Sequence, residues 1–162
     1  MKIDKICGIF EAVALLENGK LKDKWLVSIL HSKDCIENRA VSARYDMCKS
    51  VLKLEFDDVF KRTEGSRAPR AKDISRVLEW AKDKSGITVH CHAGYSRSAA
   101  VAYLIECAAS KPEEAIKVLN YKIHCPNELI VKLGADILGN DSILSTYWEW
   151  REEFDSLWIS EL

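Results

Sequence analysis

Apolar and polar positions alternate with two different periods along the first half of the chain. Apolar side chains recur with helical spacing over residues 5–17, and the Asn-Gly pair at 18–19 is typical of a helix end. Three short runs rich in β-forming residues predict buried strands at 24–30, 50–56 and 85–91. We therefore expect one helix, then two strands, and a third strand further along the chain.

The segments between and after these runs have patterns of their own. Residues 37–49 are polar and lack a regular period, so no element is predicted there. Residues 57–72 hold a Gly, a Pro and many charges, which is typical of a loop. A helix is predicted over 73–84, with Asp73 as its cap. Four more helices are predicted near 97–109, 112–122, 127–138 and 142–157.

Strands that alternate with helices in this way indicate an α/β fold. We expect a central, mostly parallel β-sheet of about four strands, flanked by helices and followed by a helical C-terminal part. The chain shows no internal repeat, low-complexity segment or linker. A single domain over residues 1–162 is therefore predicted, and this length is close to the commonest domain size.

The charge and hydropathy of the chain exclude several classes of partner. The formal net charge is −1, so the sequence predicts neither a nucleic-acid partner nor an anionic membrane partner. No stretch approaches the length of apolar residues that spans a bilayer. The apolar run near the start is interrupted by Asp4, Glu11 and Glu17, which argues against a signal peptide. A cytoplasmic location is expected.

The six cysteines do not form a recognisable metal or disulfide pattern. No pair is spaced as Cys-x-x-Cys, so neither a zinc site nor a thioredoxin-like motif is indicated. A chain of this size does not need a disulfide framework to fold. We expect the thiols to be reduced and mostly buried, with Cys91 as a separate question.

Cys91 lies in a stretch that combines unusual residue types, "VHCHAGYSRSAAVAYLI" at 89–105. The stretch joins a predicted strand to a predicted helix, and ligands of parallel sheets bind beyond such strand ends. The backbone amides of such a loop and the N-terminus of the following helix attract anions. Gly94 permits a tightly wound backbone, and Arg97 can bind a phosphate through two hydrogen bonds. A thiol facing the same positive centre ionises easily. The sequence predicts a phosphate-binding loop with Cys91 as a nucleophilic thiolate.

The segment "HCHAGYSRS" at 90–98 resembles the signature loop of cysteine-dependent protein tyrosine and dual-specificity phosphatases, including prokaryotic-type tyrosine phosphatase-like proteins. That signature is His-Cys, five residues, then Arg and Ser or Thr, with a Gly in the middle. Cys91, Gly94, Arg97 and Ser98 each match it. The resemblance implies a phosphotyrosine phosphatase-like fold for this chain.

Two further segments extend the resemblance to roughly residues 24–138. "KLEFDD" resembles the strand that precedes the general acid of the compact members, with Asp57 and Asp58 placed 34 and 33 residues before Cys91. Strand alternation and the resemblance favour Asp58 as the acid, with Asp57 as the alternative. "CPNELIVKL" at 125–133 resembles a later segment in which Asn127 would brace the phosphate loop.

The resemblance implies phosphomonoester hydrolysis through a cysteinyl-phosphate, without metal or cofactor. Cys91 would be the nucleophile, Asp58 the general acid and then base, and Ser98 a donor to the departing thiolate. His90 would form hydrogen bonds around the loop and help to hold the thiolate. The loop residues would hold a phosphate, sulfate or vanadate ion, and these are His92, Ala93, Gly94, Tyr95, Ser96 and Arg97.

The substrate is expected to be a phosphorylated protein or peptide, with phosphotyrosine preferred and phosphoserine or phosphothreonine open. The loop interior holds no Lys, whereas members that act on highly anionic substrates tend to carry one. The alternatives are a phosphatase of inositol phosphates, lipids or RNA, sulfur or arsenate chemistry, and a non-catalytic phosphoprotein-binding protein. The cations of "KRTEGSRAPRAK" at 61–72 indicate either a solvated loop or a rim that faces the substrate.

Overall fold

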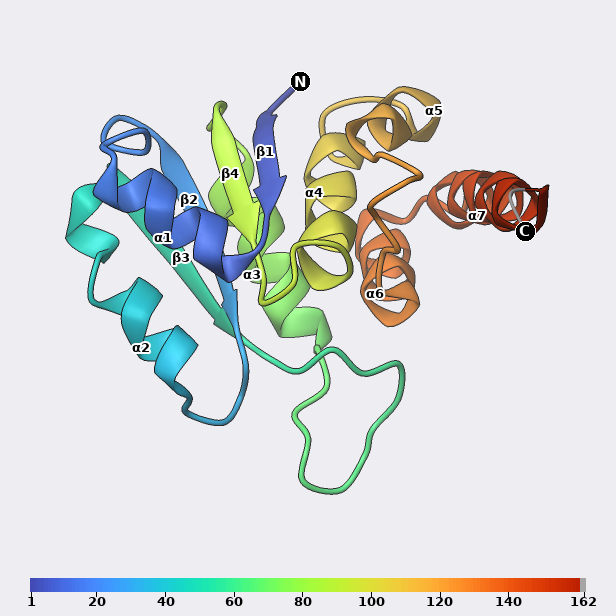
Figure 1. The fold of residues 1–162 in the computed structure, drawn as a ribbon. Helices are drawn as coiled ribbons and strands as arrows, with labels where there is room; N and C mark the ends of the chain where they lie inside the picture. The colour runs from blue at the N-terminus through green and yellow to red at the C-terminus, as the bar shows by residue number, and fades with distance from the viewer. Residues whose placement is uncertain (161–162) are drawn as a thin grey trace.

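The computed structural model describes residues 1–160 and places a four-stranded parallel sheet at the centre of the molecule (Figure 1). Residues 161–162 of the predicted domain lie outside the described residues. The strand order is β1 (Ile3–Cys7), β4 (Ile87–His90), β2 (Trp25–Leu30) and β3 (Ser50–Glu55). The predicted α/β class and the parallel sheet are confirmed.

One face of the sheet is covered by α1 (Ile9–Glu17) and α2 (Ile36–Ser42), which pack against each other and against the strands (Figure 1). Their buried side chains form a small cluster with side chains of β1 and β2. This cluster consists of Cys7, Ile9, Ala12, Leu16, Leu21, Leu26, Leu30 and Val41.

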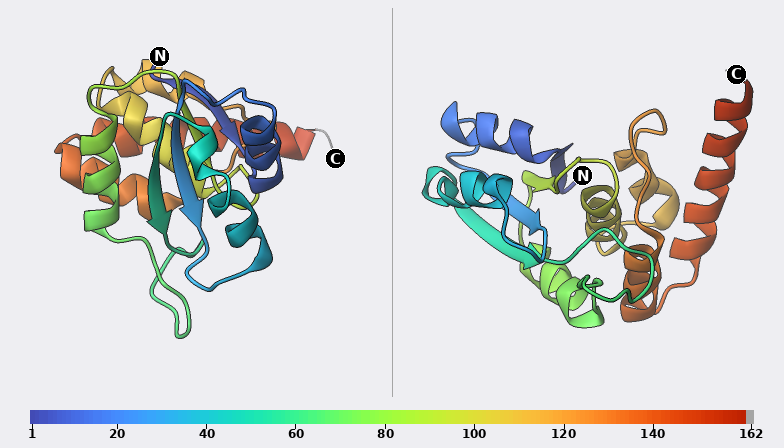
Figure 2. Two further views of the ribbon diagram at one scale, coloured as in Figure 1. Left: turned by 90° about the vertical axis from the view of Figure 1, so that its left-hand side faces the viewer. Right: turned by 60° about the horizontal axis from the view of Figure 1, so that its bottom comes forward.

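The other face carries the larger part of the core, under α3 (Ala71–Ala81), α4 (Arg97–Cys107) and α6 (Glu128–Leu138). Ten of the eleven residues of α4 are buried, from Arg97 to Glu106, because it lies between the sheet and α6. The short α5 (Pro112–Ala115) and the long α7 (Ser142–Ser160) complete the helical part (Figure 2). No helix within residues 1–160 combines the length and the apolar content needed to cross a membrane.

The predicted helix over residues 5–17 is wrong in its first turn. Residues 3–7 form β1, and the helix begins only at Ile9. Ile3, Ile6 and Cys7 pair with residues of β4, more than 80 positions away, and this tertiary pairing overrides the local helical spacing. Gly8 supplies the turn between the two elements.

Three other local predictions are corrected. Residues 37–49, predicted to be irregular, contain most of α2 and a 3-10 turn at Tyr45–Met47. The helix expected over 112–122 ends at Ala115 and continues only as a 3-10 turn to Val118. Asp73 is not the cap of α3 but its third residue, where its carboxylate accepts a hydrogen bond from the Arg70 amide.

The register of the parallel strands brings their carboxyl ends to one edge of the sheet. His90 at the end of β4 is level with Cys7 of β1 and with Ser28 of β2. Leu30 is level with Glu55 at the end of β3. The segments that follow these strands therefore meet at this edge, and residues 56–70 form a long loop that extends away from the body (Figure 1).

Candidate active site

Cys91 immediately follows β4 and lies at the bottom of a tight loop formed by residues 91–97. Only 2% of its surface is exposed. Its Sγ accepts a hydrogen bond from the Gly94 amide at 3.3 Å, and the Ser98 Oγ lies 3.1 Å away. Both groups can donate to a thiolate, so the loop is arranged to accommodate negative charge on this sulfur.

The carbonyl groups of the loop are bound on its outer side by other elements. The His92 oxygen accepts from the Ile9 amide at 3.0 Å, which ties the loop to the start of α1. The Tyr95 oxygen accepts from the Cys125 amide at 2.9 Å. The Ser96 oxygen accepts from the Asn127 amide at 3.2 Å. The segment before α6 therefore holds the second half of the loop.

The outward direction of these carbonyls determines the direction of the neighbouring backbone amides. In a planar peptide unit the C=O and N–H bonds point in opposite directions, so the amides that follow these carbonyls face the inside of the loop. The amides of residues 92, 93 and 95–97 donate no hydrogen bond to any group within residues 1–160. Together with the N-terminus of α4, they form a concave surface of donors suited to an anion.

Gly94 is required by both its backbone angle and its surroundings. Its φ is +86°, a value that side-chain-bearing residues rarely adopt. A Cβ at this position would lie 2.5 Å from the carbonyl carbon of Cys7, because the loop crosses directly over the end of β1. Close contact with β1 thus sets the curvature of the loop.

Arg97 is 2% exposed and is the first residue of α4. One guanidinium nitrogen donates to the Phe56 carbonyl at 2.8 Å, at the end of β3. Its Nε is buried and has no hydrogen-bond partner among the described residues. No carboxylate within residues 1–160 lies within 4 Å of the guanidinium. A buried cation that is oriented yet lacks a counter-charge is suited to binding an anion from solution.

His90 supports the loop from beneath through a directed chain of hydrogen bonds. Its Nδ1 lies 3.3 Å from the Cys91 carbonyl, which can only accept, so Nδ1 carries the proton. Its Nε2 therefore accepts from the Ser28 hydroxyl at 2.6 Å, and Ser28 accepts from the Tyr45 hydroxyl at 2.7 Å. Burial lowers the pKa of His90 to about 4, with Arg97 adding to the effect, so the ring is neutral.

Asp58 lies over the loop. Its Oδ1 accepts from the Ser96 hydroxyl and from the Asn127 side-chain amide, each at 2.8 Å. Its Oδ2 accepts no hydrogen bond from any described residue. The exposed carboxylate is therefore anchored through one oxygen and free at the other. The same Asn127 caps α6 by accepting from the Ile130 amide at 3.2 Å.

Asp57 points away from the loop and holds the surrounding chain together. It accepts hydrogen bonds from the Ser32 amide and hydroxyl, at 2.9 and 2.5 Å, and from the Arg67 amide at 2.8 Å. Partial burial opposes ionisation of this carboxyl, but the hydrogen bonds outweigh it and lower its pKa below the ordinary value. The geometry thus separates the two adjacent carboxylates, which the sequence left as alternatives.

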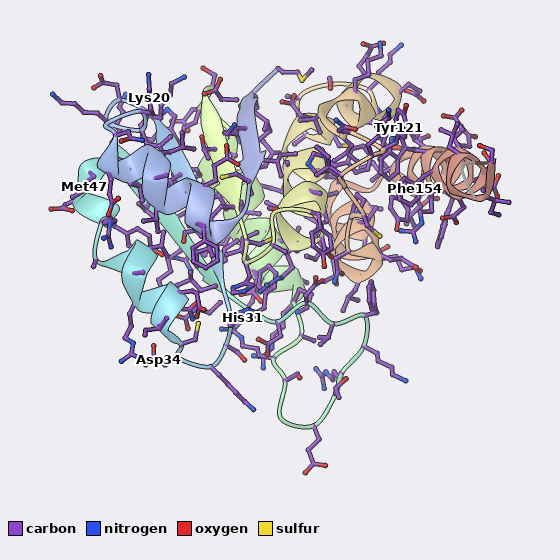
Figure 3. The ribbon with its side chains drawn as sticks, in the orientation of Figure 1. Lys20, His31, Asp34, Met47, Tyr121 and Phe154 are labelled. Carbon is purple, nitrogen blue, oxygen red and sulfur yellow. The ribbon has the colours of Figure 1, made fainter. Side chains whose placement is uncertain are left out.

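Sequence reasoning missed several neighbours of the loop. Ser28 and Tyr45 support His90, and the His31 ring lies 4.8 Å from the His92 ring and 3.8 Å from Asp57. Figure 3 shows His31 beyond the carboxyl end of β2. A signal for Ser28 was present, because it is the one polar residue inside the apolar run of β2. His31 offered no local signal in the sequence.

Two other thiols near the core differ from Cys91 in their environment. Burial raises the pKa of Cys7 to about 12, and Glu11 adds to the effect. Burial likewise raises the pKa of Cys107 to about 12. These thiols stay protonated at neutral pH, whereas Cys91 alone faces the amides of the loop and the Arg97 guanidinium.

No protein-family model and no curated protein sequence matches the chain. Solved structures do match its fold. DUSP15 aligns with a TM-score of 0.56 and 18% identity, over 91% of this chain and 89% of that chain. The PTP-2 phosphatase of Cydia pomonella aligns with a TM-score of 0.54 and 19% identity, over 80% and 83%.

The human tyrosine phosphatase-like serine/threonine/tyrosine-interacting protein aligns with a TM-score of 0.54 and 16% identity, over 83% of this chain and 96% of that chain. At these identities the likeness concerns the fold. The chain has the compact fold of protein tyrosine and dual-specificity phosphatases, as the resemblance of its loop predicted.

Proposed function

We propose that this protein hydrolyses phosphate monoesters of tyrosine in proteins, through a cysteinyl-phosphate intermediate on Cys91. The observation that carries the proposal is the loop of residues 91–97. Three of its carbonyls are bound from outside, its amides face inward, and Arg97 at its end is buried with no carboxylate of residues 1–160 as a partner. Such a site is complementary to a doubly charged, tetrahedral anion.

The loop binds the phosphoryl group before any bond changes. The inward amides of residues 92, 93 and 95–97 and the Nε of Arg97 donate to its three non-bridging oxygens. This arrangement places the phosphorus above the Cys91 sulfur, with the ester oxygen on the far side, towards Asp58. Free phosphate, sulfate or vanadate binds in the same way.

In the first step the Cys91 thiolate attacks the phosphorus and the P–O bond to tyrosine breaks. The leaving oxygen takes a proton from Asp58, whose free Oδ2 carries it while Oδ1 stays fixed by Ser96 and Asn127. The products of this step are tyrosine and an S–P bond on Cys91.

In the second step water attacks the phosphorus and releases inorganic phosphate. Asp58, now ionised, accepts a proton from the water as the new P–O bond forms. The S–P bond breaks, and the Ser98 hydroxyl, 3.1 Å from the sulfur, donates to the thiolate that departs. The loop then returns to its starting state.

A protein substrate is favoured over a small, highly charged one. The interior of the loop carries no lysine, so Arg97 is its one side-chain cation. The exposed Tyr95 at its outer surface offers an aromatic contact for a tyrosyl ring. Phosphoserine and phosphothreonine also fit the chemistry, and a comparison of phosphopeptides decides among the three.

Hydrolysis of p-nitrophenyl phosphate and of phosphotyrosyl peptides tests the proposal. We expect turnover by the purified chain, inhibition by vanadate, and loss of turnover in Cys91→Ser with retention of vanadate binding. Asp57→Asn is the matched control for Asp58→Asn, because the two carboxylates are adjacent but only Asp58 reaches the loop. Vanadate binding without turnover by the wild-type protein would instead identify a non-catalytic phosphate-binding protein.

A further inference from the structure

A groove of about 920 Å³ opens beside the candidate active site, between residues 61–71 of the long loop and α6. Its α6 wall is made by the half-buried Leu129 and Leu133. Ser66 lines both this groove and a second hollow that contains Asp57 and Asp58. The groove therefore adjoins the hollow in which Asp58 lies.

The groove is lined by four cations and one carboxylate, Glu64, so it carries an excess of positive charge. Lys61, Arg62 and Arg70 are exposed, and no carboxylate within residues 1–160 forms an ion pair with them. Arg67 is paired with Asp73 at 3.1 Å. Since the net charge of the chain is −1, this concentration of positive charge is a local feature.

The lining of the groove favours a peptide that carries both acidic and apolar side chains. Its lining includes Ala68 and Pro69 next to the two leucines, so an apolar strip runs alongside the cations. These cations lie on a loop that extends from the body (Figure 1), but they also line a hollow together with apolar side chains, a combination that a flat membrane surface does not fill. An extended peptide can place acidic side chains on the cations and an apolar side chain on the strip.

We propose that the groove binds an acidic segment of the substrate protein, next to its phosphorylated residue. The proposal rests on the function proposed above and adds a substrate class to it: phosphoproteins in which two or three carboxylates and an apolar residue flank the phosphotyrosine. Lys61 and Arg62 set this preference by attraction to the carboxylates, without taking part in the bond changes at Cys91.

The test compares two phosphotyrosyl peptides of equal length, one with Glu and Asp flanks and one with Gln and Asn flanks. The variant is Lys61→Gln/Arg62→Gln. The control, Lys20→Gln/Lys22→Gln, removes the same charge from two exposed lysines that form no ion pair within residues 1–160. Figure 3 shows Lys20 at the far end of the molecule from residues 56–70. The readouts are the kcat/KM of each peptide, its affinity for Cys91→Ser, and turnover of p-nitrophenyl phosphate.

We expect the wild type and the lysine control to prefer the acidic peptide by about tenfold, since two or three exposed ion pairs supply such a factor. Lys61→Gln/Arg62→Gln should remove the preference and leave p-nitrophenyl phosphate turnover unchanged. The preference should shrink as salt is raised.

Equal binding of the two peptides, or a preference that survives in Lys61→Gln/Arg62→Gln, overturns the proposal. Binding to vesicles that contain phosphatidylserine is measured as well. If the protein binds these vesicles through Lys61 and Arg62, and the acidic peptide does not compete, the surface binds a membrane instead of a peptide. Absence of p-nitrophenyl phosphate turnover would refute the proposed hydrolysis. The affinity of Cys91→Ser for the two peptides would still test the role of the groove. A failure of the proposed hydrolysis can therefore be distinguished from a failure of the proposed peptide binding.

Discussion

Asn127 donates a hydrogen bond of 2.8 Å to Asp58, although 69 positions separate the two residues in the sequence. The Asn127 backbone amide also binds the Ser96 carbonyl, so one residue connects the carboxylate to the phosphate loop. Through its Oδ1 the same side chain caps α6. The start of α6 therefore sets the distance between the proposed acid and the proposed nucleophile.

This relationship predicts that Asn127→Ser lowers activity without unfolding the protein. Ser also caps helices well, so α6 should persist, but its shorter side chain cannot reach Asp58. We expect kcat for phosphotyrosyl peptide to fall by about 10- to 100-fold, as a misplaced catalytic group commonly causes. Circular dichroism and vanadate binding serve as controls. An unchanged kcat would show that Asp58 is positioned without Asn127.

The two adjacent carboxylates should respond differently to the same substitution. Asp58→Asn should lower kcat by about 100-fold or more for a substrate with a poor leaving group, and by much less for p-nitrophenyl phosphate, whose leaving group needs little protonation. Asp57→Asn should destabilise the fold by about 1–3 kcal/mol, because its charged hydrogen bonds to Ser32 and Arg67 are weakened. Leaving-group series and thermal unfolding separate the two effects. The reverse pattern would assign the acid to Asp57.

His90 should make the stability of the protein dependent on pH in the mildly acidic range. Its pKa falls from 6.5 in an unperturbed ring to about 4 in the fold, where burial disfavours the charged form. Between these values the unfolded chain binds the proton and the folded chain does not, so stability decreases as the pH falls through this range, by up to about 3 kcal/mol.

Replacement of the ring isolates this contribution. In His90→Gln the side chain does not titrate, while His31 and His124, whose pKa values burial also lowers, are still present. Denaturant unfolding from pH 7 to pH 4 should therefore show a smaller loss of stability in His90→Gln than in the wild type. Parallel curves for the two proteins would contradict the prediction.

Gly94→Ala should be damaging for a steric reason as well as a conformational one. The added Cβ would overlap the Cys7 backbone, and φ at this residue is +86°. We expect a loss of about 2 kcal/mol or more and a loss of vanadate binding, because the loop must open to relieve the overlap. Gly19→Ala is the control, since Gly19 has a φ of +69° and nothing within 4 Å of the added atom. Similar losses in both variants would indicate that backbone strain alone is responsible.

Local patterns in the sequence determined most of the architecture. The strand runs at 24–30, 50–56 and 85–91 match β2, β3 and β4 to within two residues at each end, and α4 and α6 begin within one residue of the predicted positions. The hydrophobic pattern of each of these elements is clear, so its own segment of sequence is sufficient to predict it. The predicted loop at residues 57–72 is also present, since α3 begins only at Ala71.

The motif around Cys91 was visible for the same reason. Cys91, Gly94 and Arg97 fall within one continuous segment of nine residues, so the motif can be recognised without knowledge of the contacts that the loop makes with β1 and with the segment before α6. The sequence alone therefore predicted the individual residues of the proposed phosphate site. Strand alternation and the resemblance favoured Asp58 over Asp57 as the acid, but the sequence could not give the partners of either carboxylate.

The tertiary structure alone decided which groups meet. β1 replaced a predicted helical turn because Ile3 and Cys7 pair with β4, and Ser28 came to lie beneath His90 because two strands are in register. Asp58 turned towards Ser96, and Asp57 towards Ser32, through partners 25 to 69 positions distant in the chain. Periodicity encodes how each segment folds against its own neighbours, whereas contacts between distant segments form only when the sheet assembles and brings their ends together.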